Sequence, residues 1–530
     1  MTRGGRRLCV LFVAALVAAG CTTGSDSGGS GGTYADGAST LNILAGSELK
    51  DMVPILDDAR AATGVKVNLT YVGSLDGAER IAEGTTADAG WFGSDRYIGL
   101  AGASTKVLAR EKIALSPVVL GVRADVAKQL GWSSGKASWK DIVAAAGSGK
   151  LPFAMTNPTV SNSGFSALVS VASALAGGDA LSASTIDADG LKQFLSGQQL
   201  TAGSSGFLVD AFVAAQDRLA AMVNYESVLV SLNDSGRLKQ PLVLVYPTEG
   251  IVTADYPLML LNADKRDAYT KLTQYLARAD VQAKLQQLTA RRAVTAGVKP
   301  DPRLSSSLLV EASFPANIEV TRLLLDQYQT NLRRPANTVY VLDTSGSMGA
   351  PGRLDALQTA MKGLAGADNS LSGVFTRFSP RENVTVVSFS SDVNDVKHWK
   401  ITSTDPNSPE LLDLRGYIDG LTAAGNTAMY SALDRGYDEA LAAAGADPTA
   451  VTSIVLMTDG ENNSGLSSSD FVDRMKNRPT TEQDIRIFTI RFGEADPGAL
   501  QQIADITGGK VFDGRSGSLG AVFKEIRGYQ

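Results

Sequence analysis

Short apolar segments alternate with amphipathic helical segments along the chain, and this alternation constrains the fold more than any other feature. Residues 41–46 (LNILAG) and 337–343 (NTVYVLD) are each typical of a buried strand. Residues 47–64 and 353–366 follow them and have the apolar spacing of helices. Strands that alternate with helices form mainly parallel sheets with helices on both faces. The sequence therefore predicts an α/β fold.

A polar, proline-bearing stretch at residues 296–336 divides this alternation into two units. Within the first unit the pattern starts again around residues 139–177, which indicates a second lobe. Roughly 510 residues follow the first 20, enough for about three units of ordinary domain size. We therefore expect a two-lobed domain at 40–300, a linker at 301–334 and a further domain at 335–530.

The first residues have the composition of an export signal. Arg3, Arg6 and Arg7 precede an apolar run that is too short to cross a bilayer, and small residues lead to Cys21. This segment resembles the lipobox of bacterial lipoproteins, in which the peptide is cut before a cysteine that then carries the lipid. The resemblance implies a signal peptide at 1–20, an acylated (palmitate-bearing) Cys21 and the extracytoplasmic face of a bacterial cell membrane. An ordinary signal peptide with a chance cysteine is the alternative.

The segment after the cysteine is predicted to be a flexible tether. Residues 21–39 are rich in glycine and serine, and such a chain would reach roughly 20–25 Å from the membrane. The other cysteine, Cys9, lies in the predicted leader, so the exported chain could form no internal disulfide. No later apolar run is long enough to span a bilayer. We therefore expect a protein anchored to a membrane rather than threaded through it.

The charge excludes one class of partner. Without the three leader arginines, 46 of the 49 basic residues remain against 55 acidic residues, a net charge of −9. Nucleic-acid binding depends on Lys and Arg side chains that neutralise phosphates. An acidic chain without a basic stripe is therefore not expected to bind nucleic acid.

Several segments of the first unit, in their order along the chain, resemble a type II extracellular solute-binding protein of bacteria. These segments are LNILAGSELKDMVPIL, SDRYIGL, TNPTVSNSG and VYPTEGIVTADYPLMLL. The resemblance covers about residues 40–300. It implies a periplasmic-binding-protein-like domain of two α/β lobes joined by crossing strands, with a small solute bound in the cleft between the lobes.

Polar residues at helix starts are the first candidates for lining that cleft. Ser161 and Ser163 precede an apolar helix, where hydroxyls and free backbone N–H groups favour an anion. Ser47 and Ser74 follow the first two strands in the same way, although each of these serines could simply be an N-cap. Carboxylates in the cleft would instead select a cationic or hydroxylated ligand, so the solute class stays open. The remaining candidates are Asp95, Tyr225, Glu226 and Glu249.

Oxygen-bearing side chains crowd the end of the first strand of the second unit. In VYVLDTSGSM, Asp343, Ser345 and Ser347 occupy every second position. Thr427 lies in GNTAMY before a helix, and Asp459 follows the apolar strand IVLMT. The carboxyl ends of parallel strands meet at one edge of a sheet, where ligands bind. Two carboxylates and three hydroxyls, with no nitrogen or sulfur ligand, suit Mg²⁺ or another hard divalent cation.

This pattern of Asp-x-Ser-x-Ser, a distant threonine and a later aspartate resembles the metal-ion-dependent adhesion site (MIDAS) of the von Willebrand factor A-type domain. The resemblance covers about residues 335–530. It implies a Rossmann-like, mainly parallel sheet flanked by helices, with both serines bound directly to the metal. One position on the metal would be left for water or for an acidic side chain of a protein partner.

Catalysis is not expected. His398 is the only histidine and lies in a strand pattern away from both clusters, so a Ser–His or Cys–His pair is difficult to assemble. The sequence favours a lipid-anchored binding protein that couples a solute cleft to a magnesium-dependent protein-interaction site. Two alternatives stay open: the substrate-binding component of an ABC-type transporter, and a cell-surface adhesin whose first domain is a spacer.

Overall fold

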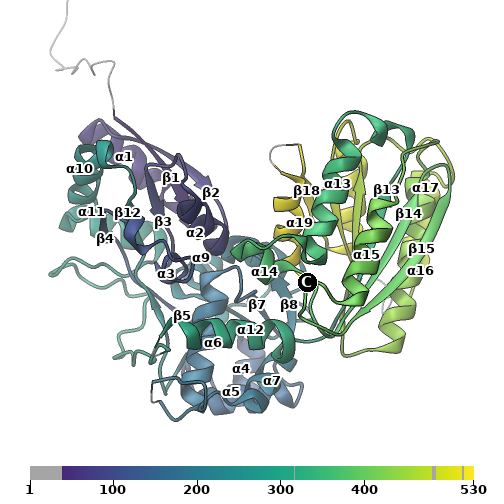
Figure 1. The fold of residues 1–530 in the computed structure, drawn as a ribbon. Coiled ribbons are helices and arrows are strands. Elements are labelled where there is room, and N and C mark those ends of the chain that lie inside the picture. The colour runs from purple at the N-terminus through teal and green to yellow at the C-terminus, as the bar shows by residue number, and fades with distance from the viewer. Residues whose placement is uncertain (1–38, 179, 316, 480–484, 516–517) are drawn as a thin grey trace, which may run out of the picture. The chain divides into compact units, whose positions relative to one another are not determined.

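The structure is a computed structural model that describes residues 39–178, 180–315, 317–479, 485–515 and 518–530 (Figure 1). The predicted signal peptide, Cys21 and nearly all of the tether lie outside the described residues, so these assignments stay predictions. Among the described helices, none combines the length and the apolar character that a membrane crossing requires.

The first lobe is built on a five-stranded sheet. Its strands, in spatial order, are β2 (Lys66–Tyr71), β1 (Thr40–Ala45), β3 (Ala89–Trp91), β12 (Pro257–Leu260) and β4 (Ala109–Lys112). The first three are parallel, and β12 runs antiparallel to both of its neighbours. Helix α1 (Val53–Thr63) is followed by its C-cap Gly64, which has the left-handed φ of 74° that glycine adopts without strain. The helices are η1 (Ser47–Met52), α1 (Val53–Thr63), α2 (Ser74–Glu83), α3 (Arg96–Leu100), α10 (Arg266–Leu276) and α11 (Ala279–Thr289).

The second lobe has a sheet of its own. Its strands follow the order β6 (Lys136–Ala137), β10 (Leu242–Pro247), β5 (Ser116–Arg123), β9 (Ala221–Tyr225), β7 (Phe153–Thr156) and β8 (Gln198–Ala202), and β11 (Thr253–Ala254) pairs with β5. The chain passes between the two sheets after β4 and again after β11. The prediction of two lobes joined by crossing strands is therefore confirmed. The helices are α4 (Ala124–Leu130), α5 (Trp139–Gly147), α6 (Asn162–Leu175), α7 (Ala188–Ser196), α8 (Ser205–Ala214) and α9 (Glu226–Asp234).

The C-terminal domain contains a six-stranded sheet. The spatial order is β15 (Val393–Ile401), β14 (Glu382–Phe389), β13 (Ala336–Asp343), β16 (Val451–Thr458), β17 (Arg486–Arg491) and β18 (Val511–Asp513). All described pairings are parallel except that of β14 with β15. The predicted mainly parallel sheet is confirmed, with β15 as an antiparallel edge strand.

Helices cover both faces of this sheet, as its apolar strands require. In β13, Val339 and Val341 lie on one face and Tyr340 and Leu342 on the other, and all four are at most 1% exposed. The covering helices are α13 (Arg353–Lys362), α15 (Pro409–Asp419), α16 (Met429–Ala446), α17 (Ser468–Asn477), α18 (Pro497–Thr507) and α19 (Leu519–Arg527) (Figure 1). Helix α14 (Leu371–Thr376) packs against α19.

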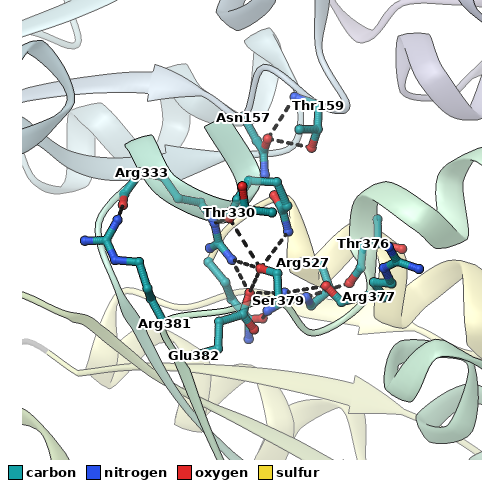
Figure 2. A network of polar contacts seen from close by, with 12 residues as sticks. Asn157, Thr159, Thr330, Arg333, Thr376, Arg377, Ser379, Arg381, Glu382 and Arg527 are labelled. Atoms are coloured by element: carbon teal, nitrogen blue, oxygen red, sulfur yellow. Dashed lines mark hydrogen bonds and ion pairs between the residues drawn. The ribbon is translucent and has the colours of Figure 1, made fainter. Parts of the chain in front are cut away.

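A buried ion cluster closes the amino end of the same sheet. Helix α12 (Ile318–Gln327) and a π-helical turn (Tyr328–Leu332) lead to Arg333, which pairs with Glu382 at the first position of β14. Arg527 of α19 pairs with the same carboxylate at 2.7 Å, and the Ser379 hydroxyl donates to it at 2.8 Å (Figure 2). The cluster therefore fastens the linker and the last helix to β14.

Candidate functional site

Two neighbouring strands of the C-terminal sheet place two carboxylates side by side. Strands β13 and β16 are paired up to Leu342 and Met457, so Asp343 and Asp459 follow at the same edge. Both carboxylates are buried, at 0% and 1% exposure. The Thr458 hydroxyl donates to Asp343 Oδ2 at 2.6 Å, which ties the two strand ends together.

The loop after β13 brings both serines to these carboxylates. Ser347 Oγ donates to Asp459 Oδ1 at 2.6 Å, and its distance to Ser345 Oγ is 3.1 Å. The backbone N–H of Ser345 donates to Asp343 Oδ1 at 2.7 Å. Ser345 is buried while Ser347 is exposed, so the hydroxyl pair runs from the interior to the surface. The Asp-x-Ser-x-Ser side chains thus converge on one point.

Thr427 reaches the same point from a different loop. A Cβ built at Gly460 would lie 3.5 Å from Ser347 Oγ and 3.7 Å from Thr427 Oγ1, so both hydroxyls face this glycine. The two loops are bonded to each other, because the backbone N–H of Gly346 donates to the carbonyl of Gly425 at 2.9 Å. The structure therefore brings all five predicted metal-site residues to one rim of the sheet.

The donor set of this rim fits a hard divalent cation. Among the described residues, no group of three or more His, Cys, Asp and Glu side chains gathers as a metal site. Hydroxyl oxygens must therefore supply much of any coordination here, as Mg²⁺ accepts and zinc or copper disfavour. Burial, above all, raises the pKa of Asp343, and nearby Asp459 adds to the rise. A bound cation would offset this unfavourable burial of negative charge.

One residue of this rim was not predicted from the sequence. Arg353, at the first position of α13, donates to Asp459 Oδ2 at 2.7 Å and also pairs with Glu494. It lies outside the Asp-x-Ser-x-Ser pattern, and its partners are 106 and 141 residues away in the sequence. No local signal marks it as part of the site.

Some predicted cleft residues do lie where the two lobes of the first domain meet. Ser47 Oγ accepts a hydrogen bond from the backbone N–H of Gly206 at 3.3 Å, across the two lobes. Asn162, at the start of α6, donates to Tyr225 Oη at 3.0 Å and accepts from Ser94 Oγ at 2.7 Å. Ser94 belongs to the first lobe, so this chain of polar groups joins the lobes. Asn162 lies in the polar helix start that the sequence singles out, whereas Ser94 was not predicted.

The serines around α6 and α2 have different surroundings. Ser163 Oγ is 2.8 Å from both Thr156 Oγ1 and Ser205 Oγ, so it belongs to a buried hydroxyl network inside the second lobe. Ser161 Oγ lies 3.5 Å from the same Ser163 hydroxyl. Ser74 opens α2, where the next backbone N–H, that of Leu75, donates to the Val160 carbonyl at 3.4 Å. Ser74 and Ser161 thus lie near the seam between the lobes.

The predicted acidic cleft residues are held by partners within the protein. Asp95 pairs with Arg110, and the fully buried Glu226 pairs with Arg292 at 2.7 Å. Glu249 Oε2 accepts the backbone N–H of Trp139, the first residue of α5, at 2.8 Å, beside the N-cap Ser138. The structure does not bring these three carboxylates into one group with the serines.

The acid at the seam is one that sequence reasoning missed. Burial raises the pKa of Glu48, whose charge acts on both Tyr225 and Tyr256. Beside it the buried Arg291 pairs with Asp51 at 2.7 Å and lies 4.7 Å from the ring centre of Tyr256. The only sequence signal for Glu48 is its position directly after Ser47, at a helix start.

Comparison with known proteins agrees with these two architectures. Residues 41–287 match the family model of bacterial extracellular solute-binding proteins, and residues 337–525 match that of the von Willebrand factor type A domain. The chain therefore carries an extracellular solute-binding domain followed by a von Willebrand factor A domain, as predicted. The first domain indicates a small solute as ligand and an extracytoplasmic location.

Solved structures and one curated relative match parts of the chain. The periplasmic binding protein AfuA from Actinobacillus pleuropneumoniae, with exogenous fructose-6-phosphate bound, is 14% identical and covers 55% of this chain and 97% of its own, with a TM-score of 0.45. A ferric binding protein from Campylobacter jejuni is 15% identical, with coverages of 54% and 98% and a TM-score of 0.42. The sulfate-binding protein SubI from Mycobacterium tuberculosis H37Rv is 19% identical, with coverages of 49% and 88% and a TM-score of 0.39.

The curated relative is an uncharacterized protein, YfbK, of Escherichia coli strain K12. It is 24% identical over 176 residues, which are 33% of this chain. The match spans about a quarter (27%) of the length of YfbK.

Proposed function

We propose that this protein is a lipid-anchored extracytoplasmic binding protein that couples a solute-binding cleft to a Mg²⁺-dependent protein-interaction site. The observation that carries the proposal is the convergence of three hydroxyls and two buried carboxylates at one rim of the C-terminal sheet. These groups come from three separate loops and meet within hydrogen-bond distance or around one glycine, as described above.

The residues of the rim would have different roles in binding a metal ion. Ser345, Ser347 and Thr427 would offer hydroxyl oxygens, and Asp459 would offer Oδ1. Asp343 holds the loop through the backbone N–H of Ser345 and would act on the cation by its charge. A bound Mg²⁺ supplies a positive centre that an acidic side chain of a partner can complete. An acidic protein could thereby bind an acidic surface locally.

The seam between the lobes supports the solute-binding half of the proposal. Ser47, Asn162 and Tyr225 present hydroxyl and amide groups from both lobes, with the Glu48 carboxylate close to Tyr225. These groups match polar, hydroxylated solutes. The similar proteins named above bind a sugar phosphate, ferric ion or sulfate, so they do not select one class of solute.

Titration calorimetry with MgCl₂ on the mature protein tests the metal half. We expect one Mg²⁺ to bind, and Asp343→Ala to abolish binding without unfolding the domain. Mg²⁺-dependent capture of a glutamate-bearing peptide, reversed by EDTA, would support the partner site. Unchanged capture by Asp343→Ala at physiological Mg²⁺ would rule out a metal bridge.

A thermal-shift screen of solutes, run with Mg²⁺ and with EDTA, tests the cleft and the coupling. A ligand that binds the folded state raises stability by RT ln(1 + [L]/Kd). Coupling is reciprocal, so a solute that alters Mg²⁺ affinity must have its own affinity altered by the same factor. Equal solute affinity with and without Mg²⁺ would leave two independent sites.

The substrate-binding component of an ABC-type transporter is the second candidate, favoured by the family match of residues 41–287. A permease and an ATPase encoded beside this gene would support it. The adhesin alternative gains support if the screen yields no solute, because the first domain would then have no ligand of its own.

A further inference from the structure

The guanidinium of Arg353 contacts two carboxylates at the metal rim, those of Asp459 and Glu494. Its Nη1 donates to Asp459 Oδ2 at 2.7 Å, and its Nη2 lies 2.6 Å from Glu494 Oε2. The Arg353 side chain is 21% exposed, whereas the Asp459 side chain is fully buried. The guanidinium therefore reaches from the surface to a carboxylate that belongs to the proposed metal site.

The turn after β17 leaves room for this guanidinium. Gly493 has a φ of 50°, and a Cβ at this position would lie 3.0 Å from Arg353 Nη1 and 2.9 Å from the Asp459 carbonyl oxygen. The backbone N–H of Glu494 donates to that carbonyl at 2.9 Å. The loop thus holds Asp459 from one side while the arginine holds it from the other.

Neither carboxylate of the rim keeps two free oxygens. Asp459 has Oδ2 occupied by Arg353, so only Oδ1 faces the serine hydroxyls. Asp343 has Oδ1 bonded to the N–H of Ser345 and Oδ2 bonded to the hydroxyl of Thr458. All four oxygens of the two carboxylates therefore already accept a hydrogen bond, and Asp459 Oδ2 accepts its bond from a charged guanidinium.

This arrangement matters because Mg²⁺ and Ca²⁺ use carboxylates differently. Mg²⁺ requires a near-octahedral shell, whereas Ca²⁺ takes six to eight oxygens and often binds a carboxylate through both oxygens. We propose that Arg353 is a specificity-determining residue that restricts Asp459 to one oxygen and thereby makes the rim prefer Mg²⁺ to Ca²⁺. The inference rests on the proposed metal site and adds to it the residue that selects the ion.

Charge and geometry can be separated by substitution. Arg353→Gln has two effects. Loss of the positive charge strengthens the binding of both cations alike, whereas release of Asp459 Oδ2 strengthens the binding of Ca²⁺ alone. Arg353→Lys keeps the charge, but a lysine is a single point donor and cannot bridge Asp459 and Glu494 as the planar fork does. The ratio of the two dissociation constants therefore reports the geometry, and the lysine variant excludes a pure charge effect.

The experiment is calorimetric titration of the mature protein with MgCl₂ alone and with CaCl₂ alone. We expect the wild type to prefer Mg²⁺ and Arg353→Gln to shift the Kd ratio toward Ca²⁺ by roughly tenfold, because ligand charge, ligand number and site rigidity set these affinities. Arg353→Lys should shift it in the same direction. The matched control is Arg474→Gln, which removes an arginine paired with Asp434 in the same domain and should leave the ratio unchanged.

Glu494→Gln guards against a folding defect, because Glu494 is 76% exposed and lies outside the metal-binding groups. It should loosen Arg353 and shift the ratio by a smaller factor in the same direction. A wild-type preference for Mg²⁺ that persists unchanged in both Arg353 variants would overturn the inference while leaving the metal site intact. A wild type that binds neither cation would overturn the metal site and the inference together.

Discussion

The two ends of the C-terminal sheet both carry buried charges, yet they are balanced differently. At the amino end, the Glu382 carboxylate is met by Arg333 and Arg527, two cations for one anion. At the carboxyl end, about 23 Å along the strands, Arg353 pairs with Asp459, and the described ion pairs give Asp343 no cation. In the first cluster the protein's own arginines compensate the negative charge, and the second still has an excess of negative charge.

The pKa directions express the same difference. Burial alone would raise the pKa of Glu382, but the charges of Arg527 and Arg333 outweigh it, and the pKa lies below its ordinary value. Burial dominates at Asp343, and its pKa is raised. Buried charge that the fold compensates is structural, whereas buried charge left uncompensated indicates a site for an added ion. Substitutions at the two ends of the sheet can test this distinction.

The largest effect is expected at the compensated end. Glu382→Gln leaves two buried arginines without a counter-charge, and breaking a buried ion pair in this way destabilises by about 3–5 kcal/mol. Urea denaturation of the mature protein measures the loss. Asp395→Asn is the control, because Asp395 is only half-buried on the same sheet and its pair with Lys397 is long, at 3.7 Å. A loss below about 1 kcal/mol in Glu382→Gln would remove the distinction between the two ends.

The opposite pattern is expected at the uncompensated end. Ser347→Ala removes an exposed hydroxyl, so stability should change by no more than about 1 kcal/mol. Mg²⁺ affinity should fall by at least the roughly 10–100-fold that loss of an outer-shell partner produces, because a direct ligand is lost. Calorimetry with MgCl₂ and urea denaturation in EDTA measure the two quantities. A variant that loses stability but keeps its Mg²⁺ affinity would make the rim structural.

The pH dependence of the free energy of unfolding should also show that Glu382 is compensated in the folded state. The pKa of Glu382 is lower in the folded state than its ordinary value of 4.5, so the folded state holds the ionised form more strongly. Its contribution is therefore present above about pH 4.5 and is lost as the pH falls through the folded-state pKa. Unfolding in EDTA between pH 7 and pH 3.5 should show wild type losing more stability than Glu382→Gln. Parallel curves would contradict the assignment.

The metal rim could be predicted from the sequence because the sheet does the positioning. Asp343, Ser345 and Ser347 are separated by single residues after a buried strand, and parallel strands bring Asp459 to the same edge. Sequence distance does not matter once both strands belong to one sheet. The α/β alternation that gave the fold class is thus also what located the site.

The charged partners could not be predicted, because pairing depends on side-chain reach rather than on strand order. Arg333 and Arg527 are 49 and 145 residues from Glu382, which in the sequence merely begins an apolar strand. Arg353 is separated from the metal motif by a short loop without a recognisable pattern. Charges on helix ends find partners only after the elements have packed.

The cleft residues were harder to predict for a related reason. A polar residue at a helix start can serve its own lobe or face the other one, and the two cases have the same sequence. Ser163 joins hydroxyls within its own lobe, whereas its neighbour Asn162 reaches Tyr225 and Ser94. Glu249, predicted for the cleft, instead accepts the first N–H of α5 from 110 residues away.

The smallest predicted effects test that division within the first domain. Glu249→Gln weakens one hydrogen bond to the first N–H of α5, whose N-cap is Ser138, and should lower stability by about 0.5–1.5 kcal/mol without changing solute affinity. Tyr225→Phe should do the reverse, because its hydroxyl lies at the seam and accepts one hydrogen bond, from Asn162. We expect the affinity for the strongest solute in the thermal-shift screen to fall several-fold, in keeping with about 1 kcal/mol for one hydrogen bond. If Glu249→Gln weakens solute binding as much as Tyr225→Phe does, the carboxylate belongs to the cleft. The prediction from the sequence, that Glu249 lines the cleft, would then be correct.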